Sequence, residues 1–170
     1  MQPPVIALTP ADAPAVARVQ AACYAPALME SAALYARRLA SPAHCSLGVP
    51  DGGGVLLAYL AACWSVRGAA TPLHGEFTPH AHADTLYLHD MAVLPTHAGR
   101  GLAQALLAAA WRAAQARGVR RAALVSVQGT AAFWRRQGFE PATAPVGMGS
   151  YGEGALYMIR ELPDFAADIS

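Results

Sequence analysis

The sequence predicts a mixed α/β fold in a single domain. Two observations lead to this prediction: a pair of apolar runs joined by a Gly-rich turn in the first half, and a strand–helix–strand–helix order in the second half. The length of 170 residues suits one domain, residues 1–170, which is long enough to bury most of its apolar surface.

The first half predicts two helices and an antiparallel pair of strands. Residues 5–8 form an expected strand, and Thr9 and Pro10 then supply the N-cap and first turn of a helix that runs to about residue 23. Pro26 interrupts the pattern before a second helix over residues 31–39. Residues 45–49 and 55–64 read as strands, and the turn Pro-Asp-Gly-Gly-Gly between them predicts a hairpin.

The second half predicts a βαβα unit followed by one more strand. Residues 67–84 collect Gly, Pro and His without periodicity and predict a long loop. Residues 85–94 form an apolar strand, and a helix begins at residue 102, with apolar residues at helical spacing, and stops at Gly118. A strand over 121–127, a short helix over 130–137 and a strand over 155–160 complete the chain.

Composition excludes several classes of protein. The formal net charge is +1, from 12 basic and 11 acidic residues, so we expect no nucleic-acid partner and no anionic membrane partner. All the basic residues are Arg, which leaves guanidinium groups as the available strong cations for phosphate.

The cysteines and the N-terminal segment suggest a cytoplasmic protein. Cys23, Cys45 and Cys63 are odd in number and lack C-x-x-C spacing, which argues against a disulfide framework and against a zinc knuckle. The N-terminus lacks a basic region followed by an apolar core, and the apolar runs are too short to span a membrane.

The turn between the strand at 85–94 and the long helix carries the main chemical signal. Gly99 and Gly101 allow the backbone to approach a phosphate, and the first N–H groups of the helix lack intrahelical partners. A plain strand-to-helix connection explains the same residues. A Walker loop is excluded because the chain has no Lys, and a dinucleotide-binding turn would lie near the first strand.

In this region the sequence resembles the GNAT acyltransferases, whose central motif is [RQ]-x-x-G-x-[GA] after an A-V-x-P-like strand end. Residues 98–103 (AGRGLA) match the last two fixed positions, whereas Ala98 stands where the motif has Arg or Gln. Residues 91–95 (MAVLP) fit the preceding strand end, and residues 132–139 (AFWRRQGF) resemble the later F-Y-x-x-x-G-F element. The resemblance is specific from about residue 85 to 139.

The resemblance implies a GNAT-like fold: a central, mostly antiparallel sheet with a splayed parallel strand pair, flanked by about four helices. It implies that coenzyme A lies between the strands that end near Val93 and Val127, with acetyl-CoA as cosubstrate and no metal. The implied cofactor-binding residues are Met91, Ala92, Val93, Ala98, Gly99, Arg100, Gly101, Leu102, Ala103, Phe133 and Trp134.

Strand parity selects His89 as the candidate base. It places Tyr87, His89, Met91 and Val93 on one face and Leu88, Asp90 and Ala92 on the other. Imidazole titrates close to neutral pH and suits proton removal from an amine. A hydrogen-bonded core histidine remains the alternative, and Asp90 is a weaker alternative base that would reach His89 only through a turn or bulge.

The proton donor to the leaving thiolate is open. The family commonly has Tyr where this chain has Trp134, and an indole N–H has no titrating proton to give. Tyr151 and Tyr87 are the candidates, each with packing as its other explanation, and water is a further donor.

The remaining residues supply weaker signals. Cys45 and Cys63 fit buried, inert thiols better than a nucleophile. The histidines of the long loop fit a solvated or substrate-facing segment better than a metal site. The resemblance implies acceptor-pocket roles for Tyr24, Glu30 and Trp64, although Glu30 also fits a carboxylate at a helix start.

These observations predict transfer of an acetyl group from acetyl-CoA to a primary amine of a small molecule or peptide, by direct attack. The alternative is a non-catalytic, coenzyme-A-binding regulatory or sensor module, and a third interpretation is a structural domain whose turn binds nothing. A homodimer is a family-level expectation.

Overall fold

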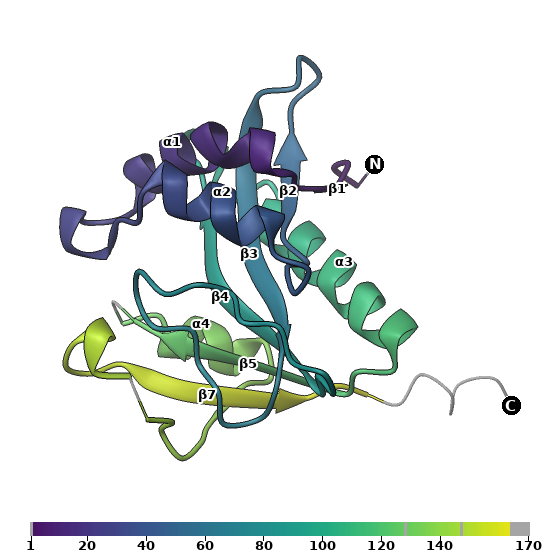
Figure 1. Ribbon diagram of the computed structural model, residues 1–170. Helices are drawn as coiled ribbons and strands as arrows, with labels where there is room; N and C mark the ends of the chain where they lie inside the picture. The colour runs from purple at the N-terminus through teal and green to yellow at the C-terminus, as the bar shows by residue number, and fades with distance from the viewer. Residues whose placement is uncertain (1, 128, 147, 164–170) are drawn as a thin grey trace, which may run out of the picture.

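The computed structural model describes residues 2–127, 129–146 and 148–163. Seven strands form one sheet in the order β1-β2-β3-β4-β5-β7-β6 (Figure 1). All neighbouring strands are antiparallel except the parallel pair β4 and β5. The strands are β1 (Ile6–Ala7), β2 (Leu47–Pro50), β3 (Leu56–Ser65), β4 (Thr85–Val93), β5 (Arg121–Ser126), β6 (Glu140–Pro141) and β7 (Leu156–Glu161).

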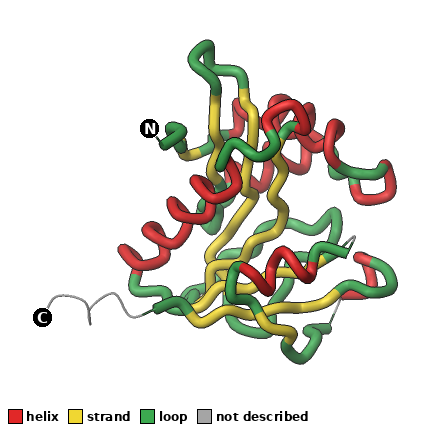
Figure 2. The backbone as a smooth tube through the Cα atoms, turned by 180° about the vertical axis from the view of Figure 1, so that it is seen from behind, coloured by secondary structure: helices red, strands yellow, loops and turns green. Residues whose placement is uncertain are grey.

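The four α-helices divide between the two faces of the sheet. α1 (Ala13–Cys23) and α2 (Ala32–Ala40) cover one face, and α3 (Leu102–Arg117) and α4 (Ala131–Arg136) cover the other, as Figure 1 and the reverse view in Figure 2 show. These faces are hereafter the α2 face and the α3 face. The expected mixed α/β fold, with its mostly antiparallel sheet, is confirmed.

Local chemistry explains where α2 begins and where α3 begins and ends. The Ser31 side chain accepts a hydrogen bond from the Leu34 N–H at 3.1 Å and caps α2. Gly101 precedes α3 and Gly118 ends it, and both adopt left-handed backbone angles that glycine tolerates best. The sequence-based boundaries of both helices hold to within a few residues.

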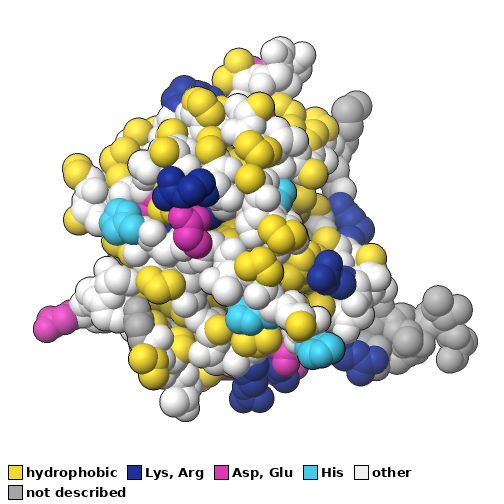
Figure 3. Space-filling model, in the orientation of Figure 1, with side chains coloured by type: hydrophobic (Ala, Val, Ile, Leu, Met, Phe, Trp, Pro, Cys, Tyr) yellow, Lys and Arg dark blue, Asp and Glu magenta, His cyan; other side chains and the backbone are white. Residues whose placement is uncertain are grey.

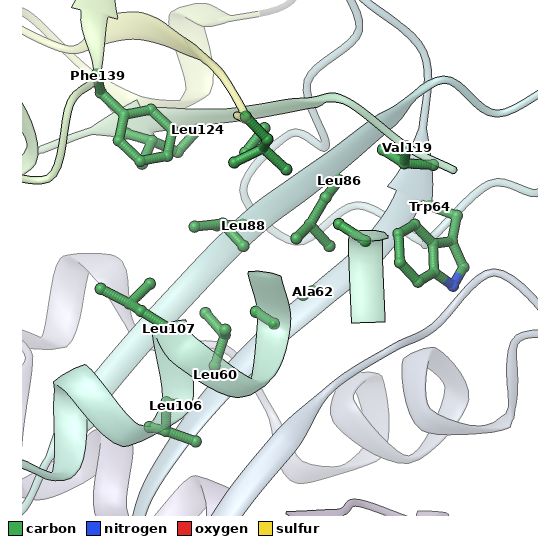
Figure 4. Close-up of a cluster of buried hydrophobic side chains, with 14 of the residues drawn as sticks. Leu60, Ala62, Trp64, Leu86, Leu88, Leu106, Leu107, Val119, Leu124 and Phe139 are labelled. Carbon is green, nitrogen blue, oxygen red and sulfur yellow. The ribbon is translucent and has the colours of Figure 1, made fainter. Parts of the chain in front are cut away.

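Two buried clusters fill the space between the helices and the sheet. On the α3 face, Leu106 and Leu107 pack against Leu60 and Leu88 (Figure 4). On the α2 face, Val16 and Val19 of α1 and Tyr35 of α2 pack with Tyr59 and Tyr87 of the strands. A side chain's cluster therefore shows the face to which it points.

A β-bulge in β4 corrects the face assignment made from strand parity. Asp90 pairs with Ala61 and Leu88 pairs with Ala62, so His89 is an extra residue in the ladder. Leu88, Met91 and Val93 pack on the α3 face, whereas His89 and Asp90 contact groups of the α2 face. The prediction that Met91 and Val93 share a face with His89, and that Asp90 lies opposite, is wrong for this reason.

The parallel strands β4 and β5 separate after a short contact. Their pairing covers Leu86–Leu88 with Ala122–Leu124, although β4 continues to Val93 and β5 to Ser126. Figure 1 shows β4 and β5 diverging from their meeting point, so the sheet opens into two halves. The side chains at this opening form the candidate site.

Some short segments escaped the sequence prediction. The two-residue strand β6 and the 3₁₀ turn η4 (Met148–Tyr151) are too short for a periodic pattern in the sequence to predict them. Residues between β3 and β4 form the expected long loop. Across the described residues, no helix combines the length and apolarity needed to cross a membrane.

Candidate active site

Two cavities adjoin each other where β4 and β5 separate. The first, of about 590 Å³, is lined in part by Phe133 and Trp134 and is hereafter the α4-side cavity. The second, of about 340 Å³, is lined in part by Glu30 and Tyr151 and is hereafter the α2-side cavity. Five residues line both: Tyr24, His89, Asp90, Val125 and Val127. The opening between the strands thus joins the two faces of the sheet.

The α4-side cavity has a largely apolar lining. Leu88, Met91 and Leu124 line it from the strands, and the Phe133 and Trp134 rings meet edge to face at 4.9 Å. Three of the residues predicted to contact the cofactor, Met91, Phe133 and Trp134, therefore border a space large enough for part of a ligand.

The turn before α3 presents free backbone N–H groups. Gly99 and Gly101 have φ angles of 75° and 79°, and a Cβ atom built at either would meet no atom within 4 Å. No side chain caps the 16-residue helix, so its first N–H groups have no intrahelical partner. Ala98, Gly99 and Arg100 are exposed while Leu102 is buried and anchors the helix. This end of α3 suits an anion such as a phosphate.

A buried ionic cluster borders the α2-side cavity. Arg38 donates to both oxygens of the Glu30 carboxylate, at 2.9 and 2.6 Å, and His89 Nε2 lies 2.8 Å from Glu30 Oε1. The three side chains are at most 2% exposed. Burial alone would raise the pKa of the Glu30 carboxyl, but the hydrogen bonds from His89 and Arg38 outweigh burial and hold that pKa well below its usual range.

Both ring nitrogens of His89 are engaged. Nε2 faces Glu30, and Nδ1 lies 3.2 Å from the Tyr151 hydroxyl, which donates to the Thr71 carbonyl at 2.5 Å. Both nitrogens thus face protein atoms rather than a ligand, and which of them carries a proton depends on the tautomer. The arrangement makes His89 a link between Glu30 and Tyr151.

Asp90 is the carboxylate with a free oxygen at the opening. Its Oδ2 accepts hydrogen bonds from the hydroxyls of Tyr35, at 2.5 Å, and Tyr59. Its Oδ1 is buried without a partner, and among the described residues the Tyr87 hydroxyl shares that condition. A buried carboxylate oxygen without a donor is unfavourable, and a ligand N–H would satisfy it.

Tyr24 lies between the two cavities. Its hydroxyl donates to the Met91 carbonyl at 3.0 Å, and it follows directly after α1. Burial, reinforced by the negative charge of Asp90, raises the pKa of Tyr24 well above its usual value. The phenol is therefore protonated at neutral pH and has a proton to donate.

The structure brings together most of the residues that the sequence singled out. His89, Tyr151, Tyr24 and Glu30 all line the α2-side cavity. Tyr87 lines neither cavity: it is fully buried, with its ring centre 6.3 Å from that of His89.

Trp64 lies apart from the opening. It pairs with Leu86, in the part of the sheet where β4 and β5 are still joined, and its ring packs under Arg117 at 4.7 Å. The antiparallel pairing of β3 with β4 thus places Trp64 outside both cavities.

Sequence reasoning missed the partners of the central carboxylates. Tyr35 and Tyr59 lie 55 and 31 positions from Asp90, and Arg38 lies 8 positions from Glu30, so no regular local spacing pairs them. Tyr35 and Arg38 do share one face of the second predicted helix, which is the signal that was available. Leu28, Leu73, Val125 and Val127 complete the α2-side cavity.

The histidines and cysteines outside this cluster give no sign of chemistry. Within the ranges that the structure describes, no three His, Cys, Asp or Glu side chains are grouped to hold a metal. Burial raises the pKa of the Cys63 thiol to about 12, which keeps it protonated and unreactive.

A family model and several solved structures match the chain. The model of the acetyltransferase (GNAT) family matches residues 14–139. A search of curated proteins found no match to this chain. The ribosomal-protein-S18-alanine N-acetyltransferase from Escherichia coli is similar, with 19% identity, a TM-score of 0.71 and 98% of each chain covered.

Two further structures contain coenzyme A or an acyl-CoA. The PaiA N-acetyltransferase from Thermoplasma acidophilum, in complex with coenzyme A, shares 12% identity and has a TM-score of 0.67, covering 95% of this chain and 99% of that one. The GphF GNAT-like decarboxylase, in complex with isobutyryl-CoA, shares 18% identity and has a TM-score of 0.69. The match covers 94% of this chain and 100% of that one. At these identities the likeness shows the fold, whereas the family model covers most of the chain. The chain belongs to the GNAT acetyltransferase family, and this membership supports acyl transfer as its general activity.

Proposed function

We propose that the chain transfers the acetyl group of acetyl-CoA to a primary amine by direct attack. The observation that carries the proposal is the unpaired Oδ1 of Asp90, which lies where the two cavities adjoin. The α4-side cavity then receives the acyl-CoA arm, and the α2-side cavity receives the amine. Acetyl-CoA supplies the thioester carbonyl that the amine attacks.

The residues near α3 fit coenzyme A. The N–H groups from Gly99 to Ala103 would hold the pyrophosphate, since Gly99 and Gly101 leave the approach open. The Ala98 N–H, which the sequence included in this set, already donates to the Pro95 carbonyl at 3.3 Å. Met91, Phe133 and Trp134 would border the arm that carries the thioester. Ala98 removes the side-chain contact that Arg or Gln would give, so the backbone supplies most of the binding.

The proton transfers fall to two residues at the opening. Asp90 Oδ1 accepts a proton from the amine as its nitrogen bonds to the carbonyl carbon. The carbon–sulfur bond breaks, and Tyr24, protonated and shared by both cavities, gives the thiolate its proton. Tyr24 thereby takes the role that the sequence left to Tyr151 or Tyr87, while His89 and Tyr151 orient the acceptor side.

Charge and cysteine state fit a cytoplasmic enzyme without a nucleic-acid partner. Cys23, Cys45 and Cys63 are free thiols, as expected in a reducing compartment. Figure 3 shows the Arg side chains of one face at separate places, some of them beside acidic side chains. A dispersed charge of this kind gives no continuous field for a polyanion.

The direct test follows thiol release from acetyl-CoA with a panel of primary amines. We expect steady turnover by the wild type and a fall of about 100-fold or more in kcat for Asp90→Asn, since a general base contributes about 10²–10⁴. Asp84→Asn changes a carboxylate just before the same strand, outside both cavities, and should stay within about two-fold of the wild type. Circular dichroism and coenzyme A binding establish that each variant is folded.

The rival hypothesis is a coenzyme-A-binding regulatory module, which Trp134 in place of the usual Tyr favours. That module would bind acetyl-CoA without steady thiol release in the presence of any amine. An Asp90→Asn variant as active as the wild type would instead remove Asp90 from the mechanism.

A further inference from the structure

We propose that the acceptor is a small primary amine with an apolar body and no carboxylate or phosphate group. This inference rests on the proposed function, because it assigns the α2-side cavity to the acceptor. It selects one substrate class from the many amines, amino acids and peptides that an acyltransferase of this kind could accept. Three features of the cavity support this inference: the loop that borders it, the charge of the groups that line it, and the apolar side chains of its walls.

The loop between β3 and β4 is fastened across the α2-side cavity. Arg38 Nε and Nη2 donate to the Gly75 carbonyl at 2.9 and 2.7 Å, and the His74 N–H donates to Glu30 Oε2 at 2.8 Å. The Tyr151 hydroxyl donates to the Thr71 carbonyl, and the Leu73 N–H donates to Ser150 Oγ at 3.1 Å. Helix α2, the loop and η4 are therefore joined around one small space.

The size of that space limits the acceptor. The α2-side cavity is the smaller of the two, at about 340 Å³ against about 590 Å³, and both volumes include space that is open to solvent. The loop that borders this space is held in place by Arg38 and Glu30, so an acceptor that extended through the loop would have to break these hydrogen bonds.

The charge of the cavity excludes an acidic acceptor. Among the described residues that line it, none is an Arg, and the chain contains no Lys. The guanidinium that contacts the lining residue Glu30, that of Arg38, makes four hydrogen bonds to Glu30 and Gly75 and lies against the Phe77 ring at 5.2 Å. Its side chain is 1% exposed, so it faces the protein rather than a ligand.

The remaining polar groups favour a cation at one end of the acceptor. Asp90 supplies a carboxylate oxygen without a partner, whereas Glu30 is neutralised by Arg38 and His89 has both nitrogens engaged. A substrate carboxylate in this space would face Asp90 without a compensating cation, a buried unpaired charge that is strongly unfavourable. An ammonium group would instead pair with Asp90, and once it has released one proton to solvent the neutral amine beside the same oxygen can attack the thioester.

The walls suit an apolar body behind the amine. Leu28 and Leu73 line one side of the cavity, and Val125 and Val127 line the strand side. These four side chains offer no hydrogen bond, and they stabilise a branched aliphatic or aromatic group by burying it. The combination describes the decarboxylated counterparts of apolar amino acids rather than the amino acids.

Two matched pairs of acceptors test the inference. Isopentylamine and leucine share a side chain, as do phenethylamine and phenylalanine, and within each pair the amino acid adds a carboxylate. We expect kcat/KM for each amine to exceed that of its amino acid by at least about 100-fold. A tripeptide amide with a free N-terminus tests a larger acceptor that carries no carboxylate, and it should react at least about ten-fold more slowly than isopentylamine.

Binding gives a readout that does not depend on turnover. Calorimetric titration of each amine into the protein saturated with coenzyme A should show isopentylamine binding and no leucine binding at the same concentrations. Asp90→Asn should weaken the binding of isopentylamine, because the substitution removes the carboxylate that pairs with the ammonium group.

A gained specificity provides the complementary test. Leu73 lies on the loop and is half-buried, so Leu73→Arg places a cation in the cavity wall. This variant should lower the ratio of kcat/KM for isopentylamine to kcat/KM for leucine by at least about ten-fold. Leu73→Met changes the shape of the side chain without adding charge and should leave that ratio unchanged.

The outcomes separate this inference from the proposed function. Selective amine binding without thiol release from acetyl-CoA would contradict the acyltransferase and retain the ligand class. Turnover that is as fast with leucine or the tripeptide amide as with isopentylamine would overturn the ligand class and retain the acyltransferase. Failure of every amine to bind and to react would overturn both.

Discussion

His89 and Asp90 are neighbours in the chain, yet both side chains contact groups on the α2 face of the sheet. The bulge at His89 makes this possible, because it adds a residue to β4 without a partner in β3. The bulge divides two roles between the pair. His89 is held between Glu30 and Tyr151, while Asp90 keeps one oxygen free at the opening.

Replacement of His89 tests this division. His89→Ala should leave the affinity for coenzyme A nearly intact and lower kcat, because Tyr151 and Glu30 lose a common neighbour. The pH dependence of kcat/KM should keep the shape that it has in the wild type, since on this account the base is Asp90 and not His89.

The pH profile is the informative readout for that variant. Loss of the acidic limb in His89→Ala would show that His89 is the base after all. Unchanged turnover would remove His89 from the mechanism altogether.

Among the elements, the contact between α2 and the β3–β4 loop depends on one buried ion pair. Glu30 precedes α2 and Arg38 lies in its last turn, and together they hold His74 and Gly75 of the loop. A second pair between the same elements, Arg37 with Glu76, has side chains that are 59% and 54% exposed. The two pairs connect the same segments in opposite environments, so they form a natural comparison.

The buried pair should dominate stability, in a way that depends on pH. Glu30→Gln leaves Arg38 buried without its carboxylate and should lower the free energy of unfolding by about 3–5 kcal/mol at pH 7. The matched change Glu76→Gln should cost no more than about 0.5 kcal/mol. Urea denaturation of the wild type and both variants measures the two values.

Lowering the pH should reduce the difference in the free energy of unfolding between the wild type and Glu30→Gln. Because folding lowers the pKa of Glu30, its stabilisation is complete above the ordinary carboxyl pKa of 4.5 and is lost progressively as the pH falls from that value toward the lowered one. The gap between wild type and Glu30→Gln should therefore shrink between pH 5 and pH 3, a range that follows from that ordinary pKa. A gap that stays constant over this range would mean that Glu30 is not ionised in the folded protein.

For the molecule as a whole, the sequence predicted the order of elements far better than their contacts. Ser31, Gly101 and Gly118 act locally, through caps and left-handed angles, so the ends of α2 and α3 were readable from the chain. The bulge at His89 could not be predicted from the sequence, because a residue without a partner in a β-ladder depends on how the neighbouring strand pairs with it. Trp64 shows the same limit: its distance from the opening follows from the pairing of β3 with β4.

The candidate site divides along the same line. The turn before α3 is a continuous segment, and its residues were named from the sequence in full. The environment of Asp90 cannot be predicted from the sequence, because its partners Tyr35 and Tyr59 lie 55 and 31 positions away. Physical pairing over such separations comes from the fold and leaves no periodic trace.

The measurement that tests the central claim most directly is calorimetric titration of acetyl-CoA into the wild type, Gly101→Glu and Gly118→Glu. Both glycines flank α3 with left-handed angles and open space around them, so the two variants carry the same strain and the same added charge. We predict micromolar binding by the wild type and by Gly118→Glu, and at least about 100-fold weaker binding by Gly101→Glu, whose carboxylate occupies the phosphate cradle. Equal binding by both variants, or no binding by the folded wild type, would contradict the account.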